Sequence, residues 1–113
     1  MKKIEAIVRP FQLEKIRDAL AGLGVSGMTV SEVRGFGRQG GHAEFYRGAE
    51  YAHSFQPKAK VEVVVRDRLT QEVMNVLRDA AYTGRVGDGK IFVLGVEEAV
   101  RIRTGDRGDF AVS

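Results

Sequence analysis

The sequence predicts an α+β domain in which one antiparallel sheet carries two helices on the same face. Three observations lead to this class. Four short segments show the alternating or continuous apolar pattern of strands, and two segments between them show apolar residues at helical spacing. Their order along the chain is strand, helix, strand, a long loop, then strand, helix, strand. A chain of 113 residues has the length of one domain, so we expect a single domain over residues 1–113.

The first half of the chain opens with a strand at residues 2–9, which ends at Pro10. A helix follows, with apolar residues at offsets of 3, 7 and 10 that form one stripe: Leu13, Ile16, Leu20 and Leu23. Gly22 and Gly24 are expected to end this helix. Residues 28–33 alternate again and predict the second strand.

The second half repeats this order. A strand is expected at residues 58–65, after Pro57, and Asp67 is expected to cap the second helix. The apolar stripe of that helix comprises Leu69, Val73, Leu77 and Ala80. Residues 91–94 are a short apolar strand.

Two successive strand–helix–strand units of this size predict the ferredoxin-like split-βαβ sandwich, with the element order βαββαβ. This topology leaves one face of the sheet uncovered. A sheet face with exposed apolar residues usually finds a partner, so we expect the chain to form an oligomer.

The composition indicates a soluble protein with a slightly basic surface. The formal net charge is +3, which permits nucleic-acid binding without requiring it. The absence of cysteine excludes disulfides, thiolate zinc sites and cysteine nucleophiles. No apolar run reaches the roughly 20 residues that a membrane helix needs, and the first residues lack the core of a signal peptide. We therefore expect a cytoplasmic protein.

A long loop at residues 36–57 interrupts the pattern, because it has no sustained period. Loops of this length inside compact domains are usually functional or disordered. Five of the nine aromatic residues of the chain fall in it: Phe36, Phe45, Tyr46, Tyr51 and Phe55. We interpret the segment as a protruding arm that docks on a partner protein. The alternative is an ordinary hairpin that extends the second and third strands.

Two glycine-rich segments are candidates for binding phosphate. Residues 84–90 match the G-x-x-x-x-G-K pattern, in which backbone amides and a lysine surround phosphate oxygens. Ile91 replaces the Ser or Thr that holds magnesium, and the segment leads from a helix into a strand, so a Walker-type NTPase is excluded. Residues 35–40 match G-x-G-x-x-G after a strand, but no helix follows.

Both segments lie at the ends of strands in one sheet, so we expect them to flank a shared cleft. The alternative for residues 84–90 is a glycine-rich turn with a surface lysine. Arg101 and Arg103 are expected on the same side of an extended segment, where their guanidinium groups suit phosphate and can reach across a subunit boundary. The alternative for this pair is an ordinary basic edge.

Taken together, these segments resemble the PII nitrogen-regulatory signal-transduction family. The similar segments are residues 35–39 (GFGRQ), 46–51 (YRGAEY), 57–58 (PK), 83–93 (TGRVGDGKIFV) and 101–105 (RIRTG). The resemblance covers essentially the whole chain, in order and spacing. It implies a homotrimer with nucleotide sites in the clefts between subunits, where ATP and ADP compete.

The resemblance also implies roles for individual residues by matching position. The implied nucleotide-binding residues are Thr29 and Val64 at the adenine, Gly35, Gly37, Arg38 and Gln39 on one wall, Gly87, Asp88, Gly89 and Lys90 at the phosphates, and Arg101 and Arg103 from the neighbouring subunit. Beside Mg-ATP the family binds 2-oxoglutarate, for which Gln39 would be the ligand of Mg²⁺ and Lys58 would pair with a carboxylate.

The implied output of this family is regulation of other proteins through the long loop. Its partners include an ammonium channel, a glutamine-synthetase-modifying enzyme and a sensor kinase, and the channel would bring the protein to the membrane periphery. Tyr51 occupies the position that a nucleotidylyltransferase modifies in many members, and the alternative is an unmodified contact tyrosine. Gly40 stands where the family commonly has a lysine.

Two other functions compete with this interpretation. The sequence pI of about 9.4 and the aromatic loop would suit a ferredoxin-like nucleic-acid-binding domain, but the predicted strands lack an aromatic pair on the sheet face. A weak ATPase is the enzymatic alternative. Ser26, Ser31 and Ser54 lack a nucleophile motif, and both histidines lie in the long loop, so we expect a non-enzymatic protein that does not bind nucleic acid.

Overall fold

The computed structural model describes residues 1–37 and 54–113. Its strands are β1 (Lys2–Val8), β2 (Thr29–Gly35), β3 (Gln56–Val65) and β4 (Lys90–Gly95). Its helices are α1 (Leu13–Gly22), α3 (Thr70–Ala81) and the short α4 (Asp109–Val112), and the 3-10 turns η1 (Pro10–Gln12) and η3 (Asp67–Leu69) precede the two longer helices. Within these ranges no helix is long and apolar enough to cross a membrane.

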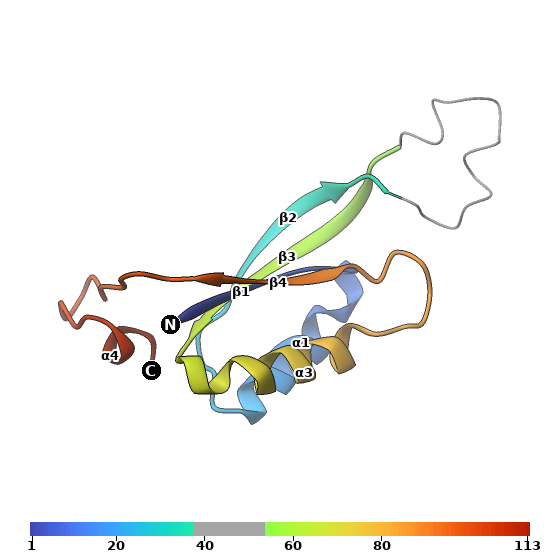
Figure 1. Cartoon of the computed structure of the whole chain (residues 1–113). Helices are drawn as coiled ribbons and strands as arrows, with labels where there is room; N and C mark the ends of the chain where they lie inside the picture. The colour runs from blue at the N-terminus through green and yellow to red at the C-terminus, as the bar shows by residue number, and fades with distance from the viewer. Residues whose placement is uncertain (38–53) are drawn as a thin grey trace, which may run out of the picture.

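The four strands form one antiparallel sheet in the order β2-β3-β1-β4, and α1 and α3 lie together on one face of it (Figure 1). The register places Ile4 opposite Val63 of β3 and Val93 of β4. This arrangement confirms the predicted ferredoxin-like class. The β2–β3 ribbon extends beyond the other two strands, toward the base of the long loop (Figure 1).

The core lies between the sheet and the two helices, and the strand alternation explains its composition. Inward-facing residues of β1 and β3 and one stripe of each helix are almost completely shielded from solvent. Its largest fully buried side chains are Ile4, Ile16, Leu20, Leu77, Val8, Val61 and Val73. Burying this apolar surface is the main force that fixes the helices on the sheet.

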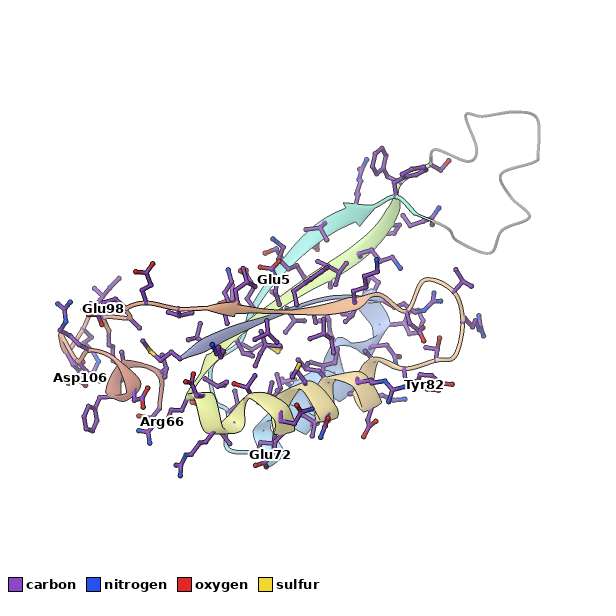
Figure 2. All side chains as sticks on the ribbon, in the orientation of Figure 1. Glu5, Arg66, Glu72, Tyr82, Glu98 and Asp106 are labelled. Carbon is purple, nitrogen blue, oxygen red and sulfur yellow. The ribbon has the colours of Figure 1, made fainter. Side chains whose placement is uncertain are left out.

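The opposite face of the sheet is open, as the topology predicts. Glu5 of β1 points to this side, away from Glu72 of α3 (Figure 2). Phe92 and Leu94 of β4 are 47% and 44% exposed, and Lys3 pairs with Glu62 at 2.9 Å. An open face that mixes apolar side chains with ion pairs is suited to contact another chain.

The structure corrects two details of the strand and helix boundaries. Pro57 lies inside β3 rather than before it. It is tolerated because β1 pairs only as far as Ala59, so this part of β3 needs hydrogen bonds on one side alone. Asp67 does not cap α3. Its carboxylate lies 2.8 Å from the amino nitrogen of Met1, and α3 begins three residues later, at Thr70.

The base of the long loop is closed by strand pairing. Gly35 pairs with Gln56, so residues 56–57 of the expected loop belong to β3. The rings of Phe36 and Phe55 meet across this base, with centroids 5.9 Å apart. Residues 38–53 lie outside the described residues, and the choice between a protruding arm and an extended hairpin falls there.

We expect Val73→Ala to reduce the free energy of unfolding by about 2 kcal/mol, because it removes two methyl groups from a fully buried site. The matched control is Val86→Ala, the same change at a side chain that is 58% exposed, for which we expect less than about 0.5 kcal/mol. Urea unfolding measures both. Equal losses would contradict the placement of the core.

Candidate functional site

The residues singled out in the sequence fall into two groups at opposite ends of β3. Lys58 lies near the base of the long loop, and Val64 lies at the other end of the strand. Six residues of extended chain separate them, which corresponds to about 20 Å. Thr29 belongs to the Val64 end, because it pairs with Glu62 on the same open face. One chain therefore carries these residues as two separate groups, which are called half-sites below.

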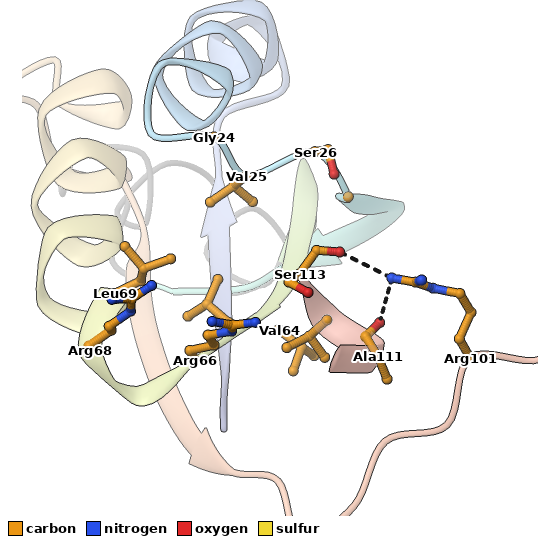
Figure 3. Close-up of a pocket in the computed structure, with 13 residues that line it drawn as sticks. Gly24, Val25, Ser26, Val64, Arg66, Arg68, Leu69, Arg101, Ala111 and Ser113 are labelled. Atoms are coloured by element: carbon orange, nitrogen blue, oxygen red, sulfur yellow. Dashed lines mark hydrogen bonds between the residues drawn. The ribbon is translucent and has the colours of Figure 1, made fainter. Parts of the chain in front are cut away.

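The half-site at Val64 borders a cavity of about 470 Å³, which Figure 3 shows. The loop between α1 and β2 forms one side, and the end of β3 forms the floor. Arg66, Arg68 and Arg101 line the cavity, and no acidic side chain does so among the described residues. Ala111 to Ser113 close it on the remaining side (Figure 3). The chemistry of this lining favours an anionic group.

The expectation that Arg101 and Arg103 lie on an extended segment is wrong. The main-chain nitrogen of Gly105 donates to the carbonyl of Arg101 at 2.7 Å, and that of Arg101 donates to the carbonyl of Asp106 at 2.8 Å. These bonds fold residues 101–106 into a tight turn. Arg103 is exposed on this turn, whereas the Arg101 guanidinium turns back toward its own chain.

The half-site at Lys58 is a cleft of about 420 Å³. Both glycine-rich loops flank it, as their strand ends predict. The sequence-predicted residues that line it are Gly35, Gly37, Lys58, Gly87, Gly89 and Lys90. Ile7, Phe36 and Phe92 supply apolar contacts. A cleft lined by four glycines and two lysines can bind phosphate or carboxylate oxygens, because glycine lets backbone amides approach a ligand and lysine supplies a positive charge.

Gly89 shows why this cleft needs glycine. Its φ is +100°, and a Cβ built there would lie 1.6 Å from the carbonyl oxygen of Ile7. No side chain fits at that distance, because the backbones of β1 and the start of β4 touch. The glycine lets the loop before β4 approach the end of β1.

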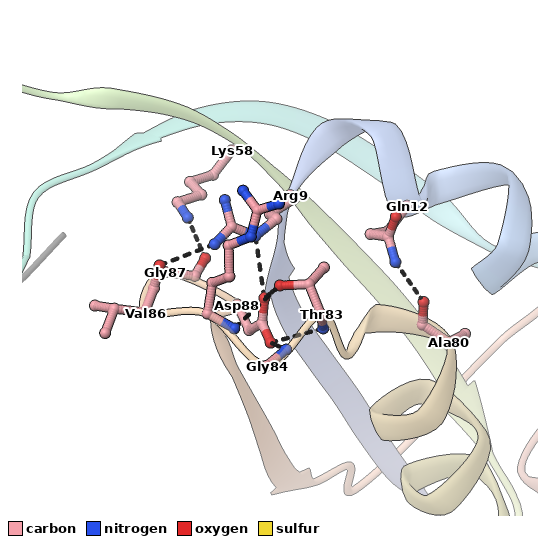
Figure 4. A network of polar contacts seen from close by, with 10 residues as sticks. Arg9, Gln12, Lys58, Ala80, Thr83, Gly84, Val86, Gly87 and Asp88 are labelled. Carbon is pink, nitrogen blue, oxygen red and sulfur yellow. Dashed lines mark hydrogen bonds and ion pairs between the residues drawn. The ribbon is translucent and has the colours of Figure 1, made fainter. Parts of the chain in front are cut away.

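Asp88 organises this loop from within (Figure 4). Its carboxylate accepts hydrogen bonds from the main-chain nitrogens of Thr83 at 2.8 Å and Gly84 at 2.9 Å, from the Thr83 hydroxyl, and from Arg9 Nε at 3.0 Å. Arg9 also donates to the carbonyl of Val86 at 2.8 Å. Burial alone would raise the pKa of the Asp88 carboxyl, but the bonds from Thr83, Arg9 and Gly84 outweigh it and hold the pKa far below its usual range.

The Asp88 side chain is thus occupied by its own loop and does not line the cleft on the Lys58 side. It borders a smaller hollow on the helix side, beside Ala81 and Ile91. Any contact of residue 88 with phosphate would therefore come from its main chain.

Lys58 is the charged residue that is most buried among the described residues, with 7% of its surface exposed. Its ammonium donates to the carbonyl of Gly87 across the cleft (Figure 4). Burial and the positive charge of Arg9 lower the pKa of this ammonium, and Asp88 opposes them. Lys58 forms no ion pair with another described residue, so an anion in the cleft would give its ammonium a negative partner.

Three predicted site residues, Arg38, Gln39 and Tyr51, lie outside the described residues. Among the described ones, no group of three or more His, Cys, Asp or Glu is arranged to hold a metal ion. Sequence reasoning gave Arg9 no role at the site. Its position directly after β1 could have indicated this role. Antiparallel pairing of β1 with β4 brings residue 9 next to the loop that precedes β4.

Comparison with known proteins gives a consistent result. The family model described as Nitrogen regulatory protein P-II matches residues 1–106. A Nitrogen regulatory protein P-II of Rhodospirillum rubrum is 55% identical over 112 residues, which cover 99% of this chain and 100% of that protein. One from Azospirillum brasilense is 56% identical over the same coverage. The crystal structure of Arabidopsis thaliana PII bound to citrate has a TM-score of 0.82 and 43% identity, and the match covers 97% of this chain and 90% of that one.

We expect Asp88→Asn to reduce the free energy of unfolding by about 1–3 kcal/mol at about pH 7, because the amide cannot satisfy all four donors. The pKa of Asp88 is lowered in the folded chain. Its contribution is therefore complete above the ordinary carboxyl pKa of 3.8 and declines as the pH falls below that value. Urea unfolding at about pH 7 and about pH 3 should show a smaller difference between variant and wild type at the lower pH. Asp79→Asn, on the exposed face of α3, is the control. A difference that grows on acidification would contradict this role for Asp88.

Proposed function

This chain belongs to the P-II nitrogen regulatory protein family, and we propose on that premise that it is a non-enzymatic sensor that binds ATP or ADP competitively and binds 2-oxoglutarate together with Mg-ATP. Members of the family are named as regulatory proteins, and regulation implies contact with target proteins. The observation that carries the proposal is the cleft between the two glycine-rich loops, which four glycines, Lys58 and Lys90 line together.

The phosphates of the nucleotide are proposed to lie at Gly87 to Lys90. The turn at Gly89 brings the backbone close to the cleft, and its amides and the Lys90 ammonium match the negative oxygens of a polyphosphate. Arg38 belongs to the same proposed wall. The adenine is proposed to contact Thr29 and Val64, which lie on one open face.

A homotrimer is proposed because neither half-site is complete in one chain. The residues near Val64 lie about 20 Å from the glycine-rich cleft of the same chain, whereas a neighbouring chain can bring the two together. The outer strands β2 and β4 are available for a head-to-tail contact, which closes into a ring when the rotation allows. Arg101 and Arg103 would then reach the phosphates held by the neighbour.

Lys58 is the proposed partner of a 2-oxoglutarate carboxylate. It is buried at the base of the long loop and its ammonium donates to the neutral carbonyl of Gly87, so a carboxylate would be a stronger partner. Gln39 is proposed to hold Mg²⁺ through its side-chain oxygen. The Arabidopsis relative was solved bound to citrate, which is also a carboxylate.

The long loop between β2 and β3, residues 36–55, is proposed to carry the output. A ligand that bridges Lys58, a metal and the loop base stabilises one loop conformation and shifts the population toward it. Proposed targets are an ammonium channel, which would bring the cytoplasmic protein to the membrane, a glutamine-synthetase-modifying enzyme and a sensor kinase. Nucleotidylylation of Tyr51 by a separate enzyme would add bulk and negative charge to the loop.

The proposed function is tested by titration calorimetry of the full chain. We expect heat from 2-oxoglutarate only when ATP and Mg²⁺ are both present, because the metal and phosphates form part of its site. Addition of ADP should remove that heat by competing with ATP. Equal binding of 2-oxoglutarate without Mg-ATP would contradict the proposal.

Single variants locate the nucleotide. Lys90→Ala and Arg103→Ala are each expected to weaken ATP binding about tenfold or more, because each removes a charged hydrogen-bond donor to phosphate. Lys15→Ala, on the exposed face of α1, is the matched control and should leave the affinity unchanged. Circular dichroism melts check that each variant is folded. Wild-type affinity in both site variants would show that the phosphates bind elsewhere.

A further inference from the structure

We propose that residues 109–113, called the tail segment here, are an internal competitor of the nucleotide. In the structure the tail segment accepts hydrogen bonds from the Arg101 guanidinium. A nucleotide that binds Arg101 must therefore displace the tail segment. The inference rests on the proposed function, because it concerns regulation of the same site.

The first support is the set of bonds that Arg101 makes. Its Nη2 donates to the carbonyl of Ser113 at 3.0 Å and to that of Ala111 at 3.4 Å (Figure 3). Its Nη1 lies 3.4 Å from an Asp106 carboxylate oxygen. The two carbonyl oxygens take up Nη2, one of the donors that a phosphate oxygen would need. A guanidinium held in this way cannot make a bidentate contact with phosphate at the same time.

The second support is the cavity that the tail segment closes. Ala111, Val112 and Ser113 form a wall of the space lined by Val64 and Arg101, two of the residues proposed to bind nucleotide. Arg66 and Arg68 add positive charge to it. The tail segment therefore sits where an anionic ligand of a neighbouring half-site would approach.

The third support is that the tail segment is weakly held by packing. Phe110, its largest side chain, is 73% exposed, so apolar burial contributes little to its position. The preceding chain is anchored firmly: Val100 bridges Arg107, the nitrogen of Gly108 donates to the carbonyl of Ala99 at 3.0 Å, and Arg107 pairs with Glu98 at 2.8 Å. Release therefore needs movement of residues 109–113 alone.

Gly108 is the hinge between the anchored and the released part. Its φ is 63° and its ψ is −140°, in the left-handed range of φ that favours glycine. A Cβ at this position would meet no atom within 4 Å, so Gly108→Ala changes the backbone preference and introduces no clash. This substitution disfavours the backbone conformation that directs the tail segment toward Arg101. It leaves unchanged the residues that accept hydrogen bonds from Arg101, which are Asp106, Ala111 and Ser113.

The expected size of the effect follows from population arithmetic. If the tail segment occupies Arg101 in about four-fifths of molecules, its removal makes the apparent Kd about fivefold lower. By reciprocity, saturating nucleotide must displace the tail segment from Arg101. The nitrogen of Ala111, which donates to the carbonyl of Gly108 at 2.8 Å, should then exchange its hydrogen faster when ADP is added.

The experiment is calorimetric titration of ADP into the full chain, into Gly108→Ala, and into a chain that lacks residues 109–113. Both altered chains are expected to bind about fivefold more tightly. Gly22→Ala, an open glycine at the end of α1, is the matched control and should bind like the wild type. In an Arg101→Ala background, removal of residues 109–113 should have no effect, because the contact that it relieves is already gone.

The outcomes separate the two proposals. Equal or weaker ADP binding after removal of residues 109–113 overturns this inference and leaves the proposed function standing. A gain that persists in the Arg101→Ala background overturns the role of Arg101. Absence of ADP binding in the wild type and in every variant overturns the proposed function and this inference with it. Thermal melts confirm that each chain is folded.

Discussion

The tie between Asp88 and Arg9 holds the glycine-rich cleft in shape. Arg9 directly follows β1, and Asp88 stands just before β4, so their 3.0 Å contact joins two neighbouring strands at the point where hydrogen bonding between them ends. The loop from Thr83 to Asp88 is folded around this carboxylate, and Lys58 reaches the carbonyl of Gly87 on the same loop. The carboxylate thus supports one wall of the cleft without facing a ligand.

The fold was largely predictable from pattern, because burial on one side of each strand imposes alternation. The alternating apolar residues Ile4, Ala6 and Val8 predict β1. The helical spacing of Val73 and Leu77 predicts α3. The boundaries were less accessible to this reasoning. Asp67 has the type of a helix cap but is drawn to the amino group of Met1, a partner that only the folded chain brings near. The local sequence around Asp67 therefore does not predict this ion pair.

The candidate site was predictable to a similar extent. Glycine and lysine at strand ends indicate a cleft, and Gly89 stands where the close approach to Ile7 requires it. The sequence did not predict the turn at residues 101–106. It also did not predict the hydrogen bonds from Arg101 to Ala111 and Ser113, because any residue type can supply a main-chain carbonyl. Arg9 was missed for a related reason, since its partner Asp88 is 79 residues away.

The division of the molecule into two half-sites has a genetic consequence. In the proposed ring, every pocket takes one wall from each of two chains. In a mixed assembly, a chain with a defective Lys90 still supplies Arg103, and a chain with a defective Arg103 still supplies Lys90. A pocket that takes Lys90 and Arg103 from these intact sides is therefore functional. Two alleles that each fail alone would complement one another when expressed together. The amount of nucleotide binding that is recovered would report the number of interfaces with an intact pocket.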